Sequence, residues 1–295
     1  MIKTSNIKDH LHLHFIVVLL GFTAILGALI ALPATELVWY RMLFACIGLW
    51  VFLFAMKVPH KLPSKQVVQL LGIGIIVALH WITFFHAIKV SNVSVTLGVF
   101  ASVTFFTSLL EPLLQKRRVF WLELLLGIVT IGGIYLIFRF ELRFTEGIIF
   151  SLTSALLNAL FVVLNRNISN RYHPGVISFY EMIGGFAFLT LFFVATGQFS
   201  NGFALPTTND FIFLLILGIV CTSYAFMAMV HILKSLSAFT VMLAINLEPV
   251  YGIMMAWLIF PQTEQMTSGF YLGAVVILSA VMAYPFLKRK FLKVG

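Results

Sequence analysis

Long apolar runs alternate with short polar stretches along the whole chain. A helix needs roughly 20 residues to cross about 30 Å of hydrocarbon, and each run reaches that length. Pro, Gly and basic residues mark several of the polar stretches, where a chain leaving the bilayer can turn and be hydrated. The pattern predicts ten membrane-spanning helices, at residues 12–32, 35–56, 66–88, 92–115, 119–138, 144–166, 174–196, 210–233, 236–260 and 268–287.

The composition agrees with an all-α integral membrane protein. Hydrophobic residues make up 61% of the chain and charged residues 10%, against roughly 25% charged residues in soluble domains. The net charge of +9 would suggest nucleic acid in a soluble chain, but here the basic residues lie between apolar runs. We therefore expect membrane lipid, not nucleic acid, around this protein. Cys46 and Cys221 lie inside apolar runs and are expected to be small buried side chains.

The distribution of Lys and Arg predicts the orientation in the membrane. With the N-terminus placed in the cytoplasm, fifteen of the 19 basic residues fall in cytoplasmic segments and three in outer ones, and Arg41 lies within a span. Lys and Arg are enriched in cytoplasmic connections, so both termini are expected there. The chain is predicted to cross its membrane many times.

Internal similarity predicts that the chain is a duplication. His86-Ala-Ile-Lys89 is echoed by His231-Ile-Leu-Lys234, 145 residues later, and further matched positions show nearly the same shift. We predict two homologous halves, 1–142 and 143–295, that form one bundle. Five spans in each half is an odd number, so the second half enters the membrane in the opposite sense. Inverted repeats are typical of secondary transporters, whose substrate site lies near the midplane between the repeats.

Glu248 is the strongest functional candidate, because an ionisable side chain inside a span is costly. It lies near the middle of the ninth predicted span and is followed by Pro249, which leaves a backbone carbonyl without its helical partner and should kink the helix. A carboxyl group beside a kink suits proton coupling or the binding of a cationic group. The alternative is a protonated, hydrogen-bonded structural glutamic acid.

Four further candidates lie on two other spans. His80 and Trp81 lie within the third span, and Phe84 shares the helix face of His80. An imidazole and an indole there could bind or stack on a substrate, and the imidazole could relay a proton. Asn158, in the sixth span, can offer a donor and an acceptor to a solute. The alternative for all of them is hydrogen bonding and packing between helices.

Arg41 and Glu181 occupy matched positions in the two halves, and inversion places them on opposite sides of the midplane. Arg41 therefore needs another partner: Glu36, a substrate carboxylate, or water at the outer surface if the side chain snorkels outward. Glu181 is expected to meet Arg166 or Arg171. We consider gating or binding for both residues, against local structural pairing.

Motifs that would indicate an enzyme or a cofactor are missing. His10, His12 and His14 alternate, so they do not share one helix face and could hold a metal only with a partner elsewhere. The chain contains no Gly-rich phosphate loop, His-Glu-x-x-His, Gly-x-Ser-x-Gly or Cys-x-x-Cys pattern. We expect no catalytic residues, no metal and no cofactor.

Several stretches resemble the EamA branch of the drug/metabolite transporter superfamily, in particular its bacterial amino-acid and metabolite exporters. They are 79–89, Leu109-Leu-Glu-Pro112, the Lys-Arg-Arg turn at 116–118 and Asn246-Leu-Glu-Pro-Val250. The family's usual proline in the fourth span is represented here by Thr104.

The resemblance implies alternating access around a central cavity lined chiefly by spans 1, 3, 4, 6, 8 and 9. The candidates on those spans are His80, Trp81, Phe84, Asn158, Glu248 and Tyr251, the last one turn beyond Glu248. Arg41 and Glu181 lie on spans that the resemblance makes peripheral, so gating is the role left to them.

The expected function is therefore secondary active export of small metabolites, such as amino acids or related compounds. Glu248 and His80 are the candidates for proton coupling, against a facilitative mechanism. The protein could act as a monomer or a homodimer. Alternatives are a carrier for a sugar derivative or a drug-like cation, and an integral-membrane enzyme acting on lipid-linked substrates. Such an enzyme would be expected to cluster its carboxylates or histidines at one interface.

Overall fold

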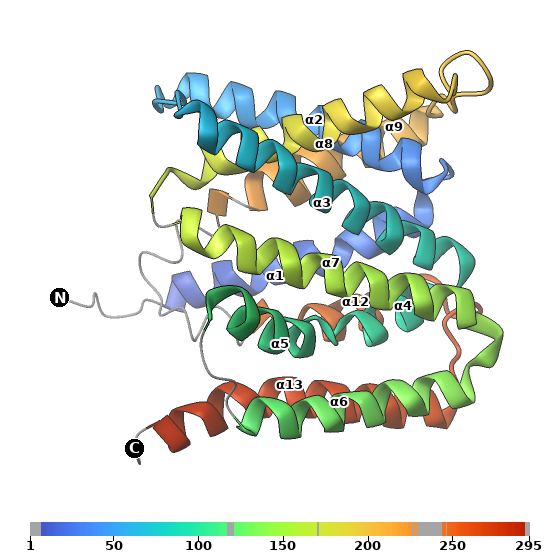
Figure 1. The fold of residues 1–295 in the computed structure, drawn as a ribbon. Helices are drawn as coiled ribbons and strands as arrows, with labels where there is room; N and C mark the ends of the chain where they lie inside the picture. The colour runs from blue at the N-terminus through green and yellow to red at the C-terminus, as the bar shows by residue number, and fades with distance from the viewer. Residues whose placement is uncertain are drawn as a thin grey trace.

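The computed structural model describes residues 7–116, 121–169, 171–225, 227–228, 244–245 and 247–292. These residues form a bundle of helices, and no strand occurs among them (Figure 1). The elements in chain order are α1 (Ile7–Leu29), α2 (Ala34–Ala55), α3 (Ser64–Val90), α4 (Val93–Phe100), α5 (Val103–Gln115), α6 (Trp121–Phe140), η1 (Leu142–Phe144), α7 (Thr145–Ser169), α8 (Pro174–Ala195), α9 (Thr208–Leu215), η2 (Ile216–Tyr224), α12 (Glu248–Ile259) and α13 (Ser268–Leu292).

Several helices begin at polar residues or prolines that flank the apolar runs, because these residues suit the first turn of a helix. The side chain of Asn92 accepts a hydrogen bond from the Val95 N–H and so caps α4. Thr207 and Asp210 form a reciprocal capping box at the start of α9. Pro174 occupies the first turn of α8, where a missing N–H costs nothing.

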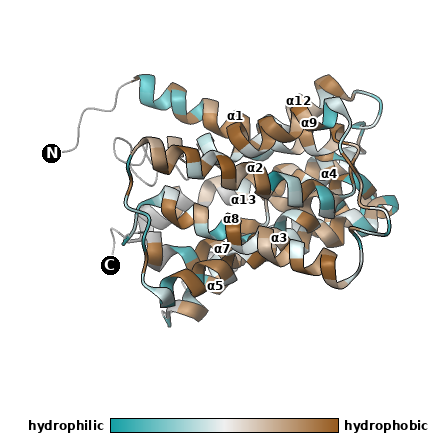
Figure 2. Ribbon diagram, turned by 90° about the horizontal axis from the view of Figure 1, so that it is seen from above, coloured by the Kyte–Doolittle hydropathy of each residue, from teal (hydrophilic) through white to brown (hydrophobic). Residues whose placement is uncertain are grey.

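Among the residues that the structure describes, six helical segments are long and apolar enough to cross a membrane, and four shorter apolar helices accompany them. The helices are predominantly apolar along their length, with polar residues gathered near the helix ends and in the connections (Figure 2). Large apolar side chains such as Phe54, Leu191 and Leu258 are exposed on the outside, where lipid would cover them. The predicted number of ten spans remains a prediction, and the matched residues His231 and Lys234 lie outside the described residues.

The fourth predicted span is two helices instead of one. The chain turns at Ala101–Ser102, between α4 and α5. A similar interruption precedes α12, which begins at Glu248 directly after the turn residue Leu247. Ser102 and Leu247 are 145 residues apart, the shift that separates the matched residues of the two halves. Asn246 lies outside the described residues.

Helices of the first half of the chain pack against helices of the second half. In Figure 1, α6 lies along α13, and the closest contacts also join α2 to α8, α3 to α7 and α1 to α12. Glycines allow the α6–α13 crossing: a Cβ atom added at Gly133 would lie 2.9 Å from the Gly273 carbonyl oxygen. Close backbone approach at small residues is a common way for helices to associate in lipid.

The two ends of the bundle differ. Ile7 at the start of α1 and Leu292 at the end of α13 lie at the same end in Figure 1, which we call the terminal end. At the opposite end, the Glu264 carboxylate accepts hydrogen bonds from the backbone N–H groups of Val93 and Ser94 at 3.0 and 2.8 Å. Hydrogen bonds between distant segments therefore tie this end of the bundle together.

Candidate functional site

A cavity of about 180 Å³ lies inside the bundle, between helices of the first and second halves of the chain. Most of its wall is apolar, and a few polar groups interrupt it. Its lining residues come from α1, α2, α3, α4, α7, η2 and α12, and they are Leu20, Thr23, Arg41, Val77, His80, Trp81, Phe84, Phe100, Asn158, Phe161, Cys221 and Glu248. Ligand sites are typically concave and mainly apolar, with a few placed polar groups.

Five of the six residues predicted to bind substrate line this cavity: His80, Trp81, Phe84, Asn158 and Glu248. They come from α3, α7 and α12, so segments up to 168 residues apart in the sequence meet here. Their role in binding stays a prediction, but their gathering in one place is a property of the fold.

The sixth residue, Tyr251, is directed elsewhere. Its hydroxyl group forms a 2.8 Å hydrogen bond with Nδ1 of His14 on α1, and it does not line the cavity. His12 makes a similar 2.9 Å contact with the hydroxyl of Tyr224. Two histidines of the alternating run thus connect α1 to α12 and η2.

His80 is held by Ser154 on α7. Its Nδ1 lies 2.8 Å from Ser154 Oγ and 3.0 Å from the Ser154 carbonyl oxygen. A carbonyl only accepts, so this contact places a proton on Nδ1 and leaves Nε2 as an acceptor. The ring also stacks on Phe100 at a centroid distance of 5.6 Å. The interhelical hydrogen bond considered as the alternative to function is present, in a side chain that also faces the cavity.

Arg41 lies in the cavity wall, and its side chain is 4% exposed. The centre of its guanidinium group is 3.6 Å from the centroid of the Trp81 ring, a cation–π contact. Nε donates a 3.1 Å hydrogen bond to Thr222 Oγ1. Nη1 is buried without a hydrogen-bond acceptor among the described residues.

This placement corrects two expectations about Arg41: the side chain does not snorkel outward, and it does not pair with Glu36. The carboxylate of Glu36 instead accepts hydrogen bonds from Thr35 at 2.5 Å and Gln198 at 3.2 Å. Although α2 was expected to be peripheral, it brings Arg41 into contact with Trp81 of α3 and Thr222 of η2.

Glu181, the second gating candidate, lies away from the cavity. Its Oε1 accepts a 2.6 Å hydrogen bond from Nδ2 of Asn165, so the contact that the structure describes is with an amide and not with an arginine. Glu181 stands where α8 crosses α3, and a Cβ atom at Gly74 would collide with its backbone. The two matched residues of the halves thus have different surroundings, because Arg41 lines the cavity and Glu181 does not.

Glu248 is the first residue of α12, and Pro249 follows in the first turn. Pro249 therefore lies in the first turn of α12, where a missing N–H costs little, and the interruption beside Glu248 falls at the turn residue Leu247. A recess of about 80 Å³ adjoins the main cavity and shares Phe100, Asn158 and Glu248 with it. Asn158 makes no hydrogen bond to any described residue, so its amide is available on the cavity side.

The recess lies between the two helix breaks. Besides the shared residues, its lining comes from both sides of each interruption: Ala101, Val103, Thr104, Ile245 and Pro249. In transporters, interrupted helices place polar backbone groups and helix ends beside a midplane site. Here the breaks before α5 and α12 flank the same small space.

Thr222 was missed in the sequence, although it fixes Arg41. It belongs to η2, a π-helical segment in which its Oγ1 donates to the Leu217 carbonyl five residues back at 2.8 Å. Single π-helical turns inside helices often occur at functional sites. The polar pair Thr222–Ser223 inside an apolar run was the available signal.

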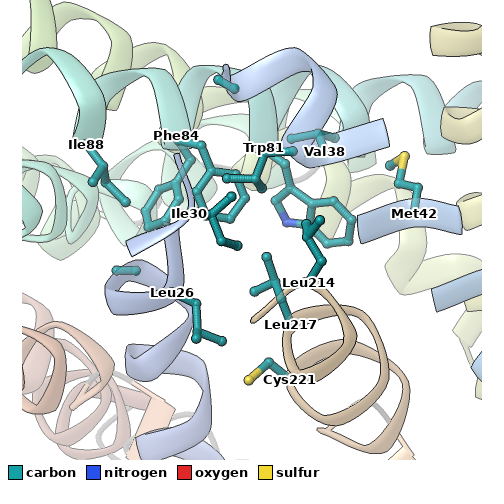
Figure 3. Close-up of a cluster of buried hydrophobic side chains, with 14 of the residues drawn as sticks. Leu26, Ile30, Val38, Met42, Trp81, Phe84, Ile88, Leu214, Leu217 and Cys221 are labelled. Atoms are coloured by element: carbon teal, nitrogen blue, oxygen red, sulfur yellow. The ribbon is translucent and has the colours of Figure 1, made fainter. Parts of the chain in front are cut away.

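Apolar packing holds the aromatic wall in place. Figure 3 shows Trp81 beside Val38 of α2 and Leu214 of α9. Phe84 lies one turn along the same helix in this cluster, near Ile30. The indole under Arg41 is therefore packed against side chains of α2 and α9.

Comparison with known proteins gives the family. The model of the EamA-like transporter family matches the chain twice, at residues 11–139 and 145–284. No curated protein matches the sequence. Among solved structures, a crystal structure 14% identical in sequence aligns with a TM-score of 0.65, covering 96% of this chain and 99% of that one, which shows a shared fold. The chain belongs to the EamA-like transporter family and is a multi-pass membrane transporter of a small-molecule substrate.

Proposed function

We propose that this protein is a secondary transporter that exports amino acids or related small metabolites across the bacterial inner membrane by alternating access. The observation that carries the proposal is the cavity, which gathers one carboxyl group, one guanidinium, one imidazole and one amide in an otherwise mainly apolar wall. Its volume of about 180 Å³ is below the roughly 300–1,000 Å³ of pockets for drug-sized ligands. A small solute fits this space better than a peptide or a lipid.

The helix arrangement supports alternating access between two inverted halves, 1–142 and 143–295. Helices that correspond in the two halves pack on each other, as α6 does on α13 and α2 on α8. Rocking one half against the other around a fixed midplane site is the usual mechanism for such an arrangement. With both termini in the cytoplasm, the end held by Glu264 faces the outside.

Glu248 is the proposed coupling group, and His80 is a second group that could carry a proton. The Glu248 carboxylate lies at the beginning of α12 and is partly open to the cavity. A carboxylate there can hold either a proton or the ammonium group of a substrate, but not both. Competition between the two would link outward movement of substrate to inward movement of protons.

The test is transport by the purified protein in liposomes that contain a radiolabelled amino acid mixture, with and without an imposed pH gradient. We expect efflux to rise when protons can flow in the opposite direction, and Glu248→Gln to lose that dependence. Glu146→Gln is the matched control, because Glu146 is an exposed carboxylate whose contact is with His86 at 3.0 Å. Efflux that ignores both the gradient and Glu248→Gln would remove the coupling, and no flux of any amino acid would remove the substrate class.

A drug-like cation is the second candidate substrate, favoured by the aromatic wall around Glu248. Trp81, Phe84, Phe100 and Phe161 all line the cavity, and aromatic faces attract cations. Flux of a quaternary aromatic cation that exceeds the flux of every amino acid would favour this candidate.

A further inference from the structure

We propose that Arg41 is the anion-binding end of the cavity, and that the transported solute carries a carboxylate as well as an ammonium group. The inference rests on the proposed function, in which the cavity is the transport site. It assigns a specific role to a residue on a helix that was expected to be peripheral, and it fixes the charge pattern of the substrate.

The first observation is that the guanidinium group lacks acceptors. Arginine has five N–H donors, and the described residues supply one acceptor, Thr222 Oγ1. Nη1 is fully buried and makes no hydrogen bond there. A buried charge without a partner is costly, and an anion that entered the cavity would remove much of that cost.

The acidic side chains that might have served as partners are engaged elsewhere. Glu36 on the same helix bonds Thr35 and Gln198, and Glu181 bonds Asn165. Glu248 is near enough to interact electrostatically with Arg41, but the two described side chains form no ion pair. The cavity therefore keeps its positive and negative groups apart.

The guanidinium group is also held in one orientation. Its face lies on the Trp81 ring, and its Nε is bonded to Thr222, whose hydroxyl is in turn fixed to the Leu217 carbonyl. A guanidinium group held in this way loses little conformational freedom when it binds a planar carboxylate. Support of this kind, from a ring below and a hydroxyl at one edge, is what a preorganised anion site needs.

The remaining wall indicates the rest of the ligand. Arg41 on α2 and Glu248 on α12 give the cavity two poles, which match the carboxylate and the ammonium group of a zwitterion. The other lining side chains are chiefly apolar, including Leu20, Val77 and Phe161. An amino acid with an apolar side chain satisfies both poles and this wall.

Three probes of similar shape separate the two charges. L-leucine carries both, 3-methylbutylamine carries the ammonium group alone, and 4-methylpentanoate carries the carboxylate alone. Binding to the purified full-length protein is measured as the rise of Tm over a concentration series, for wild type, Arg41→Gln, Arg41→Lys and Glu248→Gln. Arg171→Gln is the matched control, because Arg171 is exposed at the start of a connection.

We expect Arg41→Gln to weaken L-leucine and 4-methylpentanoate about 10- to 100-fold, the effect of a lost hydrogen bond to a charged group. 3-Methylbutylamine should keep its affinity within about threefold, which also shows that the variant is folded. Glu248→Gln should do the reverse for the two single-charge probes. If Arg41→Gln does not fold, Arg41→Lys supplies the test, because it retains the charge but not the fork, and it should weaken the two carboxylates more than the amine.

Equal weakening of all three probes by Arg41→Gln or Arg41→Lys would overturn the inference, because a structural role predicts that result. Wild-type protein that binds neither L-leucine nor 4-methylpentanoate would also overturn the inference. Flux of 3-methylbutylamine would then show that the protein is a transporter without this anion site. Binding of 4-methylpentanoate that depends on Arg41, without flux of any amino acid, would support the anion site and refute amino-acid export. The two proposals can thus fail separately.

Discussion

Glu264 connects the segment after α12 to the start of α4 at the end of the bundle opposite the termini, and one substitution can test whether this contact holds that end closed. Its side chain is 2% exposed, and its two oxygens accept hydrogen bonds from the Val93 and Ser94 N–H groups at the start of α4. A helix N-terminus leaves such donors without an internal partner. Glu264→Gln keeps the shape of the side chain but replaces one acceptor oxygen by an NH₂ donor.

The size of the effect follows from these contacts. A hydrogen bond to a charged group contributes about 1.5–3 kcal/mol, and a carboxylate at a helix N-terminus adds about 0.3–1 kcal/mol. Glu264→Gln removes one bond, makes the other neutral and removes the charge, so the closed form should lose about 2–3 kcal/mol. Since 1.4 kcal/mol is a factor of ten, the population with this end open should rise roughly 30- to 140-fold.

Cys221 is a natural reporter for this opening, because it lines the cavity and is buried in the closed form. In a Cys46→Ser background, a membrane-impermeant maleimide is added to intact cells and the rate of Cys221 labelling is measured. We expect Glu264→Gln to accelerate labelling, and Glu146→Gln, at the same end but exposed, to leave the rate unchanged. An unaltered rate in Glu264→Gln would refute the closing role, and faster labelling only in inside-out vesicles would refute the orientation.

Three substitutions test packing and the support of Arg41, each by thermal unfolding in detergent. Gly133→Ala should destabilise the protein by about 1–3 kcal/mol, because the added Cβ would meet a backbone oxygen of α13. Gly132→Ala has open space and should be neutral. Equal effects of the two substitutions would contradict the close packing of α6 on α13. Trp81→Leu should lower Tm more than Trp81→Phe, since phenylalanine keeps an aromatic face for Arg41. Thr222→Val should cost about 1–3 kcal/mol by removing the acceptor of Nε, and an unchanged Tm would mean that the hydrogen bond contributes little.

Much of the fold could be predicted because lipid imposes a length on each apolar run. The run 35–56 corresponds to α2 at Ala34–Ala55, and the run 174–196 to α8 at Pro174–Ala195. Asn92 and Thr207 mark helix starts by their capping side chains. The turn at Ala101–Ser102 could not be predicted, because no proline lies near it and it depends on the surrounding packing.

The depth of Arg41 in its span could be predicted, but the direction of its side chain could not. A helix that is hydrophobic on all sides has no polar face from which the inward side can be recognised, and α2 is of that kind. Thr222 was hidden for a different reason. The π-helical segment shifts the side chains after Ile216 relative to the spacing of an α-helix. The direction of Thr222 toward Arg41 therefore could not be found by assuming α-helical spacing.

Matched positions in the two halves carry different side chains with different surroundings, and this difference bears on the substrate. Glu248 begins α12, and the residue 145 positions earlier, Val103, begins α5: the break is shared, but the carboxyl group is present once. Arg41 faces the cavity, while its matched residue Glu181 is bonded to Asn165 outside it. A frame that repeats can open to either side of the membrane with similar packing, whereas a site whose charges occur once can distinguish the two ends of a solute.

A negative pole from one half and a positive pole from the other would also move relative to each other when the halves rock. Binding of a zwitterion would therefore stabilise the conformations in which the distance between the poles matches the distance between its two charges. On this reasoning a solute with one charge should bind without favouring closure, and L-leucine, but neither of its single-charge analogues, should slow the labelling of Cys221 in Glu264→Gln.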